Sequence, residues 1–217
     1  MIKMENVDIH GWEAAIRGMR NPLDSHAKSD SYWTHIRNEE TGNEAKFQYF
    51  VGDADLALMH KLSKAGDDHG KFMRFIDVTL DITAPLYWWK EFDTYKVGTV
   101  ANSYSTMHKI HAKPFEESDF SMEHLREMPH QVFVSLIKVL NIYRVKFLDH
   151  GDKNYWWQLI QLLPSSYNQR RTIKLNYAVL KAMYHARKNH KLDEWRAFCA
   201  WIESLPYAKE LIVDAQH

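Results

Sequence analysis

The chain has 217 residues, in which 28 lysines and arginines balance 28 aspartates and glutamates, so its formal net charge is zero. A neutral chain has no overall field to draw it to nucleic acid or to an anionic membrane, so we expect neither partner. One cysteine, Cys199, excludes an intrachain disulfide, and no run approaches the roughly 20 apolar residues of a membrane span. The N-terminus has no apolar signal segment, so we expect a cytoplasmic protein.

The first predictable elements lie in the N-terminal third. Residues 11–25 are typical of a strand leading into a helix, and we assign no chemistry to residues 1–50. Residues 53–66 have apolar positions at helical spacing, with Asp53 where an N-cap is expected and Gly66 as a stop. The sequence therefore predicts a short helix there.

A strand, a helix and a loop follow in that order. Residues 72–82 alternate between apolar and polar side chains, which predicts a half-buried strand whose polar face is a candidate site wall. Pro85 suits the first position of a helix that continues to Lys96. Residues 98–120 show neither helical nor strand periodicity, so we predict a long functional loop.

The C-terminal half is predicted to be helical. Residues 128–151 form a long packing helix, and residues 156–163 a short helix that stops before Pro164 and leads into a polar turn. Residues 172–190 and 192–206 are predicted as two amphipathic helices. The inward side chains expected on the long helix and on the last one are Val132, Leu136, Val139, Leu140, Tyr143 and Phe147, and Leu192, Trp195, Phe198, Cys199 and Ile202. We find no internal repeat or linker, so the predicted fold class is α/β (α+β), one helix-rich domain over residues 1–217 around a modest sheet.

Common catalytic motifs are missing from the chain. It has no Walker loop, no GxGxxG after a strand, no HExxH and no nucleophile elbow. The pairs His108 with His111 and His185 with His190 lack a carboxylate or cysteine at ligand spacing, so we expect solvated or capping histidines and no metal. Cys199 has no basic neighbour and is expected to be a buried structural thiol.

A dispersed set of polar groups remains, and it suits a planar, anionic ligand. Hydroxyls can position phosphate oxygens, while the guanidinium group of arginine supplies a bidentate, charge-assisted bond. Basic residues near helix ends can equally be solvated or neutralise the helix dipole, so the pattern alone leaves both readings open. The residues concerned are Lys96, Ser103, Ser105, His108, Arg170, Arg171 and Arg187.

The order of three segments resembles the flavin-dependent thymidylate synthases over roughly residues 55–205. These are "KAGDDHGKFMRFIDVTLDITAPLYWWKEF", the hydroxyl-rich loop with Ser105, and "LPSSYNQRRTIKLNYAVLKAMYHARKNHKLDEWRAF". Asp68-His69 resembles the acidic-histidine pair of the family, with His69 at a flavin-contacting position. Asn176 and Arg187 match the asparagine and the distal arginine of the family's late helix, where Ala178 replaces a second arginine. Glu194 and Arg196 match its closing E-x-R.

The family signature, R-H-R followed by N-E-x-S-x-R-Y, is strongly altered here. It falls on Thr94-Tyr95-Lys96, then on Asn102 and Ser105, and its final R-Y on Met107-His108. Lysine in place of arginine keeps the charge and loses the planar fork. Each lost charge-assisted hydrogen bond costs about 1.5–3 kcal/mol. Three such losses, at Thr94, Met107 and Ala178, make unchanged catalysis difficult to reconcile with this sequence.

The resemblance implies binding of FAD and of a pyrimidine nucleotide such as dUMP, with methylenetetrahydrofolate and NADPH used only by an active enzyme. It also implies a homotetramer with shared sites, in which we expect Trp88, Trp89 or Trp195 near subunit contacts. Two hypotheses stay open: a divergent nucleotide methyltransferase, or a non-catalytic nucleotide-binding or scaffold protein on the same fold. The implied site residues are Lys96 and Ser105 as catalytic groups; His69, Tyr95 and Asn176 for the cofactor; and Ser103, Ser105, Arg170 and Arg187 for the substrate.

Overall fold

The computed structural model describes residues 2–36 and 46–215, and within them the chain divides into two compact units. The first contains residues 2–5, 81–94 and 101–173, and the second contains residues 6–80, 95–100 and 174–215, less the undescribed gap. Each unit is therefore built from segments far apart in the sequence. The single domain predicted above stays a prediction.

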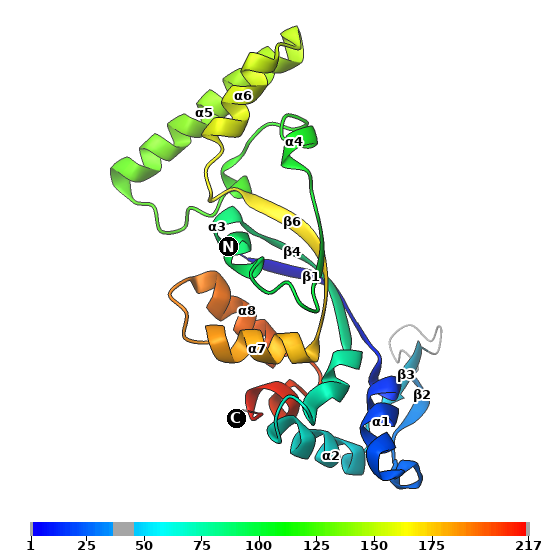
Figure 1. Ribbon diagram of the computed structural model, residues 1–217. Coiled ribbons are helices and arrows are strands. Elements are labelled where there is room, and N and C mark those ends of the chain that lie inside the picture. Colours follow the sequence, from blue (N-terminus) through cyan, green and yellow to red (C-terminus); the bar gives the residue numbers. More distant parts are fainter. Residues whose placement is uncertain (1, 37–45, 216–217) are drawn as a thin grey trace. The chain divides into compact units, whose positions relative to one another are not determined.

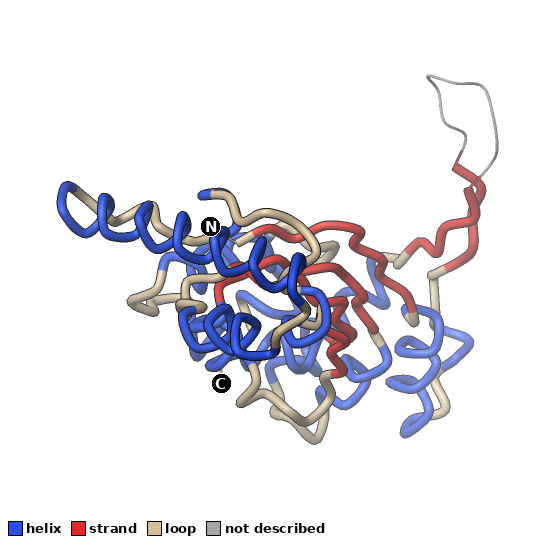
Figure 2. The backbone as a smooth tube through the Cα atoms, turned by 90° about the horizontal axis from the view of Figure 1, so that it is seen from above, coloured by secondary structure: helices blue, strands red, loops and turns tan. Residues whose placement is uncertain are grey.

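Four strands pair in the order β1-β4-β6-β5, and β2 and β3 form a separate antiparallel pair. All strands are drawn in red in Figure 2. The strands are β1 (Lys3–His10), β2 (Tyr32–Ile36), β3 (Lys46–Phe50), β4 (Asp77–Pro85), β5 (Val100–Ser103) and β6 (Asn168–Asn176). The predicted alternation in β4 is confirmed, because Val78, Leu80 and Ile82 are buried. The helix-rich α/β (α+β) fold around a modest sheet is thus confirmed.

The second unit contains most of the helices, with α7 and α8 packed side by side (Figure 1). Its helices are α1 (Trp12–Arg20), α2 (Asp53–Lys64), α7 (Tyr177–Arg187) and α8 (Asp193–Glu203), joined by the short 3-10 helices η1 (Asn21–Leu23), η2 (His26–Lys28) and η3 (Gly70–Phe75) and the π-helix η5 (Lys209–Val213). As predicted, α8 buries Trp195, Phe198, Cys199 and Ile202. Gly52, not Asp53, is the N-cap of α2, so the carboxylate of Asp53 lies in the first turn, where it favours the helix dipole.

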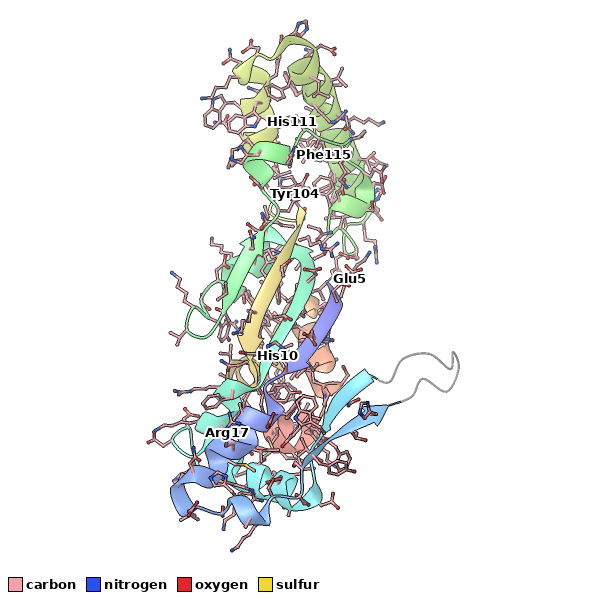
Figure 3. The ribbon with its side chains drawn as sticks, turned by 90° about the vertical axis from the view of Figure 1, so that its right-hand side faces the viewer. Glu5, His10, Arg17, Tyr104, His111 and Phe115 are labelled. Atoms are coloured by element: carbon pink, nitrogen blue, oxygen red, sulfur yellow. The ribbon has the colours of Figure 1, made fainter. Side chains whose placement is uncertain are left out.

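The first unit contains α3 (Leu86–Phe92), α4 (Thr106–Lys109), the 3-10 helix η4 (Glu117–Asp119), α5 (Glu127–His150) and α6 (Lys153–Leu162). Its core cluster contains Phe115 and Phe120 of the 98–120 segment together with Ile137, Leu140 and Leu159 of the paired helices. Figure 3 shows His111 and Phe115 beside these two helices. The segment predicted as a plain loop is therefore partly regular, containing β5, α4 and η4.

Three boundary predictions in this part of the chain are wrong for identifiable reasons. Pro85 ends β4 and caps α3, and α3 stops at Phe92 because Thr94 N donates to the carbonyl of Glu91 in a closing turn. Residues 168–176 form a strand, where a turn and the start of a helix were predicted. Ile173 and Leu175 face the core at a spacing of two, and the helix begins only after the capping Asn176.

The predicted inward stripe of α5 is also wrong in part. Ile137 and Leu140 are buried, whereas Val132 and Val139 are exposed. Trp88, Trp89 and Trp195 have no exposed surface, so their rings form the core, and surface for a partner subunit must come from other residues.

Candidate functional site

A cavity of about 680 Å³ lies in the second unit, between α1, the turns that follow it, α2 and η3. Its walls are mainly apolar, with Leu58, Phe72 and Phe75 among them. Three cationic side chains, Arg20, Lys28 and Lys71, also line it, together with the predicted cofactor residue His69 and with Asp68, whose carboxylate pairs with Lys71 at 3.2 Å. The size falls within the range of about 300–1,000 Å³ typical of small-molecule sites. The cavity therefore suits a flat, partly apolar ligand.

Phe72 and Phe75 enter this cavity wall because residues 70–75 form a 3-10 helix, in which residues three apart lie on one side. Phe72 is buried, while Phe75 is 53% exposed. An exposed phenylalanine ring beside a cavity offers a face for stacking. Nothing in the sequence analysis assigned a role to either ring, although the Phe-x-x-Phe spacing was visible.

A buried ion pair forms the base of the same cavity wall. The Nε of Arg20 donates to Oδ1 of Asp55 at 2.6 Å, and the side chains are 4% and 0% exposed. The hydroxyls of Ser29 and Ser31 donate to the other carboxylate oxygen, each at 2.6 Å. Burial by itself raises the pKa of Asp55, but the two hydroxyls and Arg20 together lower it by more than burial raises it. The pKa of Asp55 therefore lies below its usual value. Asp55 is therefore held ionised.

The remaining donors of Arg20 fix the loop that borders the cavity. Its two terminal nitrogens donate to the carbonyls of Ser25 and Lys28, each at 3.1 Å. Because Ser25 and Lys28 both line the cavity, the guanidinium group determines where this wall lies. Sequence reasoning missed Arg20 and Asp55, since a pair 35 residues apart leaves no local signal.

A second group of site residues gathers around Arg187 at the end of α7. Its Nε donates to the hydroxyl of Tyr95 at 2.9 Å, and its guanidinium carbon lies 4.9 Å from the ring centroid of Trp195 and 5.6 Å from that of Tyr95. Stacking on electron-rich rings stabilises the cation and limits the directions in which it can donate. Two predicted residues, Tyr95 and Arg187, are thus brought together, and Trp195 supports them.

The N-terminus of α7 is formed by Asn176, and the segment that follows Tyr95 and Lys96 lies close to it. The Oδ1 of Asn176 accepts a hydrogen bond from Val179 N at 3.1 Å, which makes Asn176 the N-cap of α7. Gly98, at φ +81°, passes so close that a Cβ there would lie 2.9 Å from Val179 and 3.3 Å from the Asn176 amide nitrogen. Asn176 therefore has a structural role besides its predicted one, and Lys96 is exposed nearby in the chain.

The first unit contains Ser103, Ser105 and Arg170. Ser103 ends β5 and is exposed, while Oγ of Ser105 caps α4 by accepting from His108 N at 3.2 Å, which leaves its own proton available to donate. Arg170 donates to Asp81 at 2.6 Å. An arginine already paired with a carboxylate has less to offer a phosphate. The predicted meeting of Ser105 with Arg187 involves residues of different units and stays a prediction.

Other predicted groups have local partners as well. Arg171 lies with its guanidinium carbon 4.2 Å from the ring centroid of Trp89 and pairs with Asp93 at 2.7 Å. The Oγ1 of Thr94 donates to the carbonyl of Glu91 at 2.7 Å. Cys199 is buried, which raises the pKa of its thiol to about 11, as expected for a structural cysteine. Across residues 2–36 and 46–215, no three metal-ligating side chains cluster and no helix has the length and hydropathy of a membrane span.

Comparison with solved structures shows that the chain has the fold of the flavin-dependent thymidylate synthases. It is similar to thymidylate synthase X (ThyX) from Helicobacter pylori with FAD and dUMP, at a TM-score of 0.69 and 17% identity over 100% of both chains. A second structure of that enzyme with FAD and dUMP has a TM-score of 0.68 and 16% sequence identity, over 99% of this chain and 100% of the other. A UMP/dUMP methylase, PolB, from Streptomyces cacaoi has a TM-score of 0.59 and 14% sequence identity, over 98% of this chain and 95% of the other. No protein-family model and no curated protein sequence matches the chain.

Proposed function

We propose that this protein binds a flavin, FAD, in the cavity beside His69. The observation that carries the proposal is that cavity itself, with its phenylalanine rings, the imidazole and the cations Lys28 and Lys71. An isoalloxazine or adenine ring stacks well on phenylalanine, and a pyrophosphate is attracted by lysines. The solved proteins of the same fold contain FAD together with dUMP. A bound flavin would supply hydride-transfer chemistry, while the protein orients it and controls access of water.

We propose a pyrimidine nucleotide such as dUMP as the second ligand, with Arg187 and Ser105 at its phosphate. Arg187 is already oriented by Tyr95 and Trp195, so little conformational entropy would be lost when it bound an anion. Ser103 and Arg170 are secondary candidates, because Arg170 would have to share its guanidinium with Asp81. Tyr95 and Asn176, the other predicted cofactor residues, do not line the cavity beside His69, and each has a structural partner, so their cofactor role stays a prediction.

Thymidylate synthesis is the doubtful part of this proposal. Charge that develops on a uracil ring needs preorganised cationic donors, and loss of one costs about a hundredfold or more in rate. Thr94 stands at an arginine position of the family signature, and its hydroxyl is engaged by the carbonyl of Glu91. Lys96 and Ser105 are the remaining candidates for catalytic groups. Methylenetetrahydrofolate and NADPH would be substrates only of an active enzyme, a nucleotide methyltransferase; the alternative is a non-catalytic nucleotide-binding or scaffold protein.

Titration of flavin fluorescence with the purified protein tests the cofactor proposal. We expect saturable binding of FAD that weakens at least tenfold in Phe75→Ala and in His69→Ala, with His124→Ala, an exposed histidine of the other unit, as the matched control. Because both target side chains are exposed, the variants should fold normally. Wild-type protein that neither binds FAD nor is purified with a flavin absorbance band would refute the proposal.

Calorimetry with dUMP tests the nucleotide part separately. Arg187→Ala should abolish binding, whereas equal affinities, or no binding by either protein, would contradict the assignment. Growth of a thymidine-requiring strain tests catalysis. We expect no rescue, and robust growth without thymidine would show that the altered signature still supports synthesis.

We also propose a homotetramer, as the family resemblance implies. In such an assembly, sites would be shared between subunits. Light scattering that gives the mass of one chain, 25.7 kDa, would remove the shared-site part of the proposal.

A further inference from the structure

The buried face of β6 changes from apolar to polar along the strand. Alternate residues of a strand point to the same face, and toward the C-terminal end of β6 this face carries Ile173 and Leu175, which have no exposed surface. Toward the other end it carries Gln169, which is 7% exposed, and Arg171, whose side chain is 14% exposed. Long polar side chains are costly to bury unless they form hydrogen bonds, so both need defined partners.

The side-chain amide of Gln169 reaches the backbone just before Ser105. Its Nε2 donates to the carbonyl of Tyr104 at 2.9 Å, and its Oε1 accepts from the Nε of Arg171 at 3.0 Å. Tyr104 also pairs with β6 directly, since its N–H donates to the carbonyl of Arg170 at 2.9 Å, and Figure 3 shows it at this end of the strand. Two hydrogen bonds therefore fix Tyr104, whose carbonyl belongs to the peptide bond with Ser105.

Arg171 determines which way the amide of Gln169 is turned. A guanidinium group can only donate, so the oxygen of Gln169 faces Arg171 and its NH2 group is directed to the carbonyl of Tyr104. Arg171 is itself held by Asp93, whose Oδ1 accepts from Nη1 at 2.7 Å, and by Trp89, whose ring centroid lies 4.2 Å from the guanidinium carbon. The indole N–H of Trp89 donates to the carbonyl of Gln169 at 2.9 Å. We call this connected set the Arg171 network; its members are Trp89, Asp93, Gln169 and Arg171.

The Arg171 network connects the two ends of the altered signature segment. Asp93 ends α3 and directly precedes Thr94, where the signature begins. At the other end, the Oγ of Ser105 accepts from His108 N at 3.2 Å, so its own proton is available to a ligand. The direction of that hydroxyl depends on the backbone between Tyr104 and Ser105. A polar group that is misplaced by about 1 Å loses much of its effect on a ligand.

We propose that Gln169 and Arg171 are positioning residues that place Ser105 through the carbonyl of Tyr104, with Asp93 as their anchor. The proposal rests on the proposed role of Ser105 at the phosphate of a pyrimidine nucleotide. Arg171, which the sequence alone allows as a phosphate ligand, has a supporting role here, because its guanidinium group is largely buried and is already engaged by Asp93 and Gln169. Neither positioning side chain contacts the nucleotide.

An isosteric change at Gln169 tests the link to Tyr104. Gln169→Glu keeps the size of the side chain and the acceptor for Arg171, but a carboxylate cannot donate to the carbonyl of Tyr104. We expect the affinity for dUMP, measured by calorimetry, to fall about tenfold, the factor that corresponds to one typical hydrogen bond.

Asn141→Asp is the matched control, because it removes the same kind of bond from the same segment at a distance from Ser105. The Nδ2 of Asn141 donates to the carbonyl of Phe115 at 2.9 Å, ten residues beyond Ser105. This variant should lose about as much stability as Gln169→Glu and keep the dUMP affinity of the wild type. Equal losses of affinity in both variants would indicate general loosening of the segment and would overturn the proposal.

Amide hydrogen exchange gives a readout that needs no ligand. The N–H groups of His108 and Lys109 donate to the Oγ and the carbonyl of Ser105, so their exchange rates report how firmly Ser105 is held. In Gln169→Glu these rates should rise about tenfold, and in Asn141→Asp they should not change. Unchanged rates in Gln169→Glu would overturn the proposal. A wild type that binds no dUMP would refute the proposed nucleotide site instead, and the exchange rates would then decide the positioning role by themselves.

Arg171→Lys separates support from direct contact. Lysine keeps the positive charge and loses the fixed directions in which the guanidinium group donates. Because Arg171 acts through Gln169, the variant should show the same rise in exchange at His108 and Lys109, and the same loss of affinity, as Gln169→Glu. Affinity that falls while exchange stays unchanged would make Arg171 a ligand of the nucleotide and would overturn the proposal.

Discussion

Replacing Arg20 by methionine should destabilise the protein and open the wall of the candidate cofactor cavity. Methionine fills the space of the aliphatic stem but removes the guanidinium group from Asp55, which is completely buried. Breaking a buried ion pair on one side costs about 3–5 kcal/mol. Because the hydroxyls of Ser29 and Ser31 still donate to the carboxylate, we expect a loss of stability at the lower end of this range, about 3 kcal/mol.

The cost should depend on pH with a definite sign. The pKa of Asp55 in the folded protein lies below its usual value, so its ionised form contributes stability that is complete above the unfolded pKa of about 3.9. That contribution is lost as the pH falls through the lower, folded pKa. Without Arg20 the pKa of Asp55 rises. The difference between wild type and Arg20→Met should therefore be largest near neutral pH and should shrink as the pH falls far enough to protonate Asp55 of the variant, which then needs no cation.

Urea denaturation followed by tryptophan fluorescence, at neutral pH and at pH 3, measures both effects. The double variant Arg20→Met/Asp55→Asn is the matched control, because it has neither charge and should recover part of the lost stability. FAD affinity should also fall in Arg20→Met, since the carbonyls of Ser25 and Lys28 lose their donor. A loss below about 1 kcal/mol at neutral pH, or an equal loss at both pH values, would refute this reasoning.

Three further predictions concern single side chains. Cys199 should resist a disulfide reagent at pH 8 until the protein is unfolded, because burial raises its pKa to about 11; rapid labelling of native protein would contradict this. Asn176→Ala should lose about 1 kcal/mol through the α7 cap and Asn176→Ser much less, so weaker FAD binding in both would indicate a direct cofactor role. Gly98→Ala should cost more than Gly66→Ala, since both positions have positive φ but only Gly98 adds a close contact with Val179; equal shifts in Tm would exclude that contact as a cause.

Elements with a strong internal pattern were predictable. The alternation of Val78, Leu80 and Ile82 defines a strand with one buried face, and Gly151 ends α5 in the left-handed conformation expected of a helix stop. Residues 168–176 carry a weaker pattern, with two apolar side chains among polar ones. This segment becomes strand β6 because it lies between β4 and β5, which supply partners for its backbone hydrogen bonds.

The site divides in the same way. The resemblance of three segments to a known family indicated the fold, which is confirmed, and it named His69, Tyr95, Asn176 and Arg187 as candidate site residues, which stay predictions. Sequence could not reveal that Arg187 stacks on Trp195 and bonds to Tyr95, 92 residues earlier, nor that Phe75 lines a cavity with His69. Such contacts require the chain to close long loops, and their geometry is determined by the packing of several elements at once. For the same reason, only the tertiary structure decided that Val132 and Val139 of α5, which were predicted to face inward, are exposed.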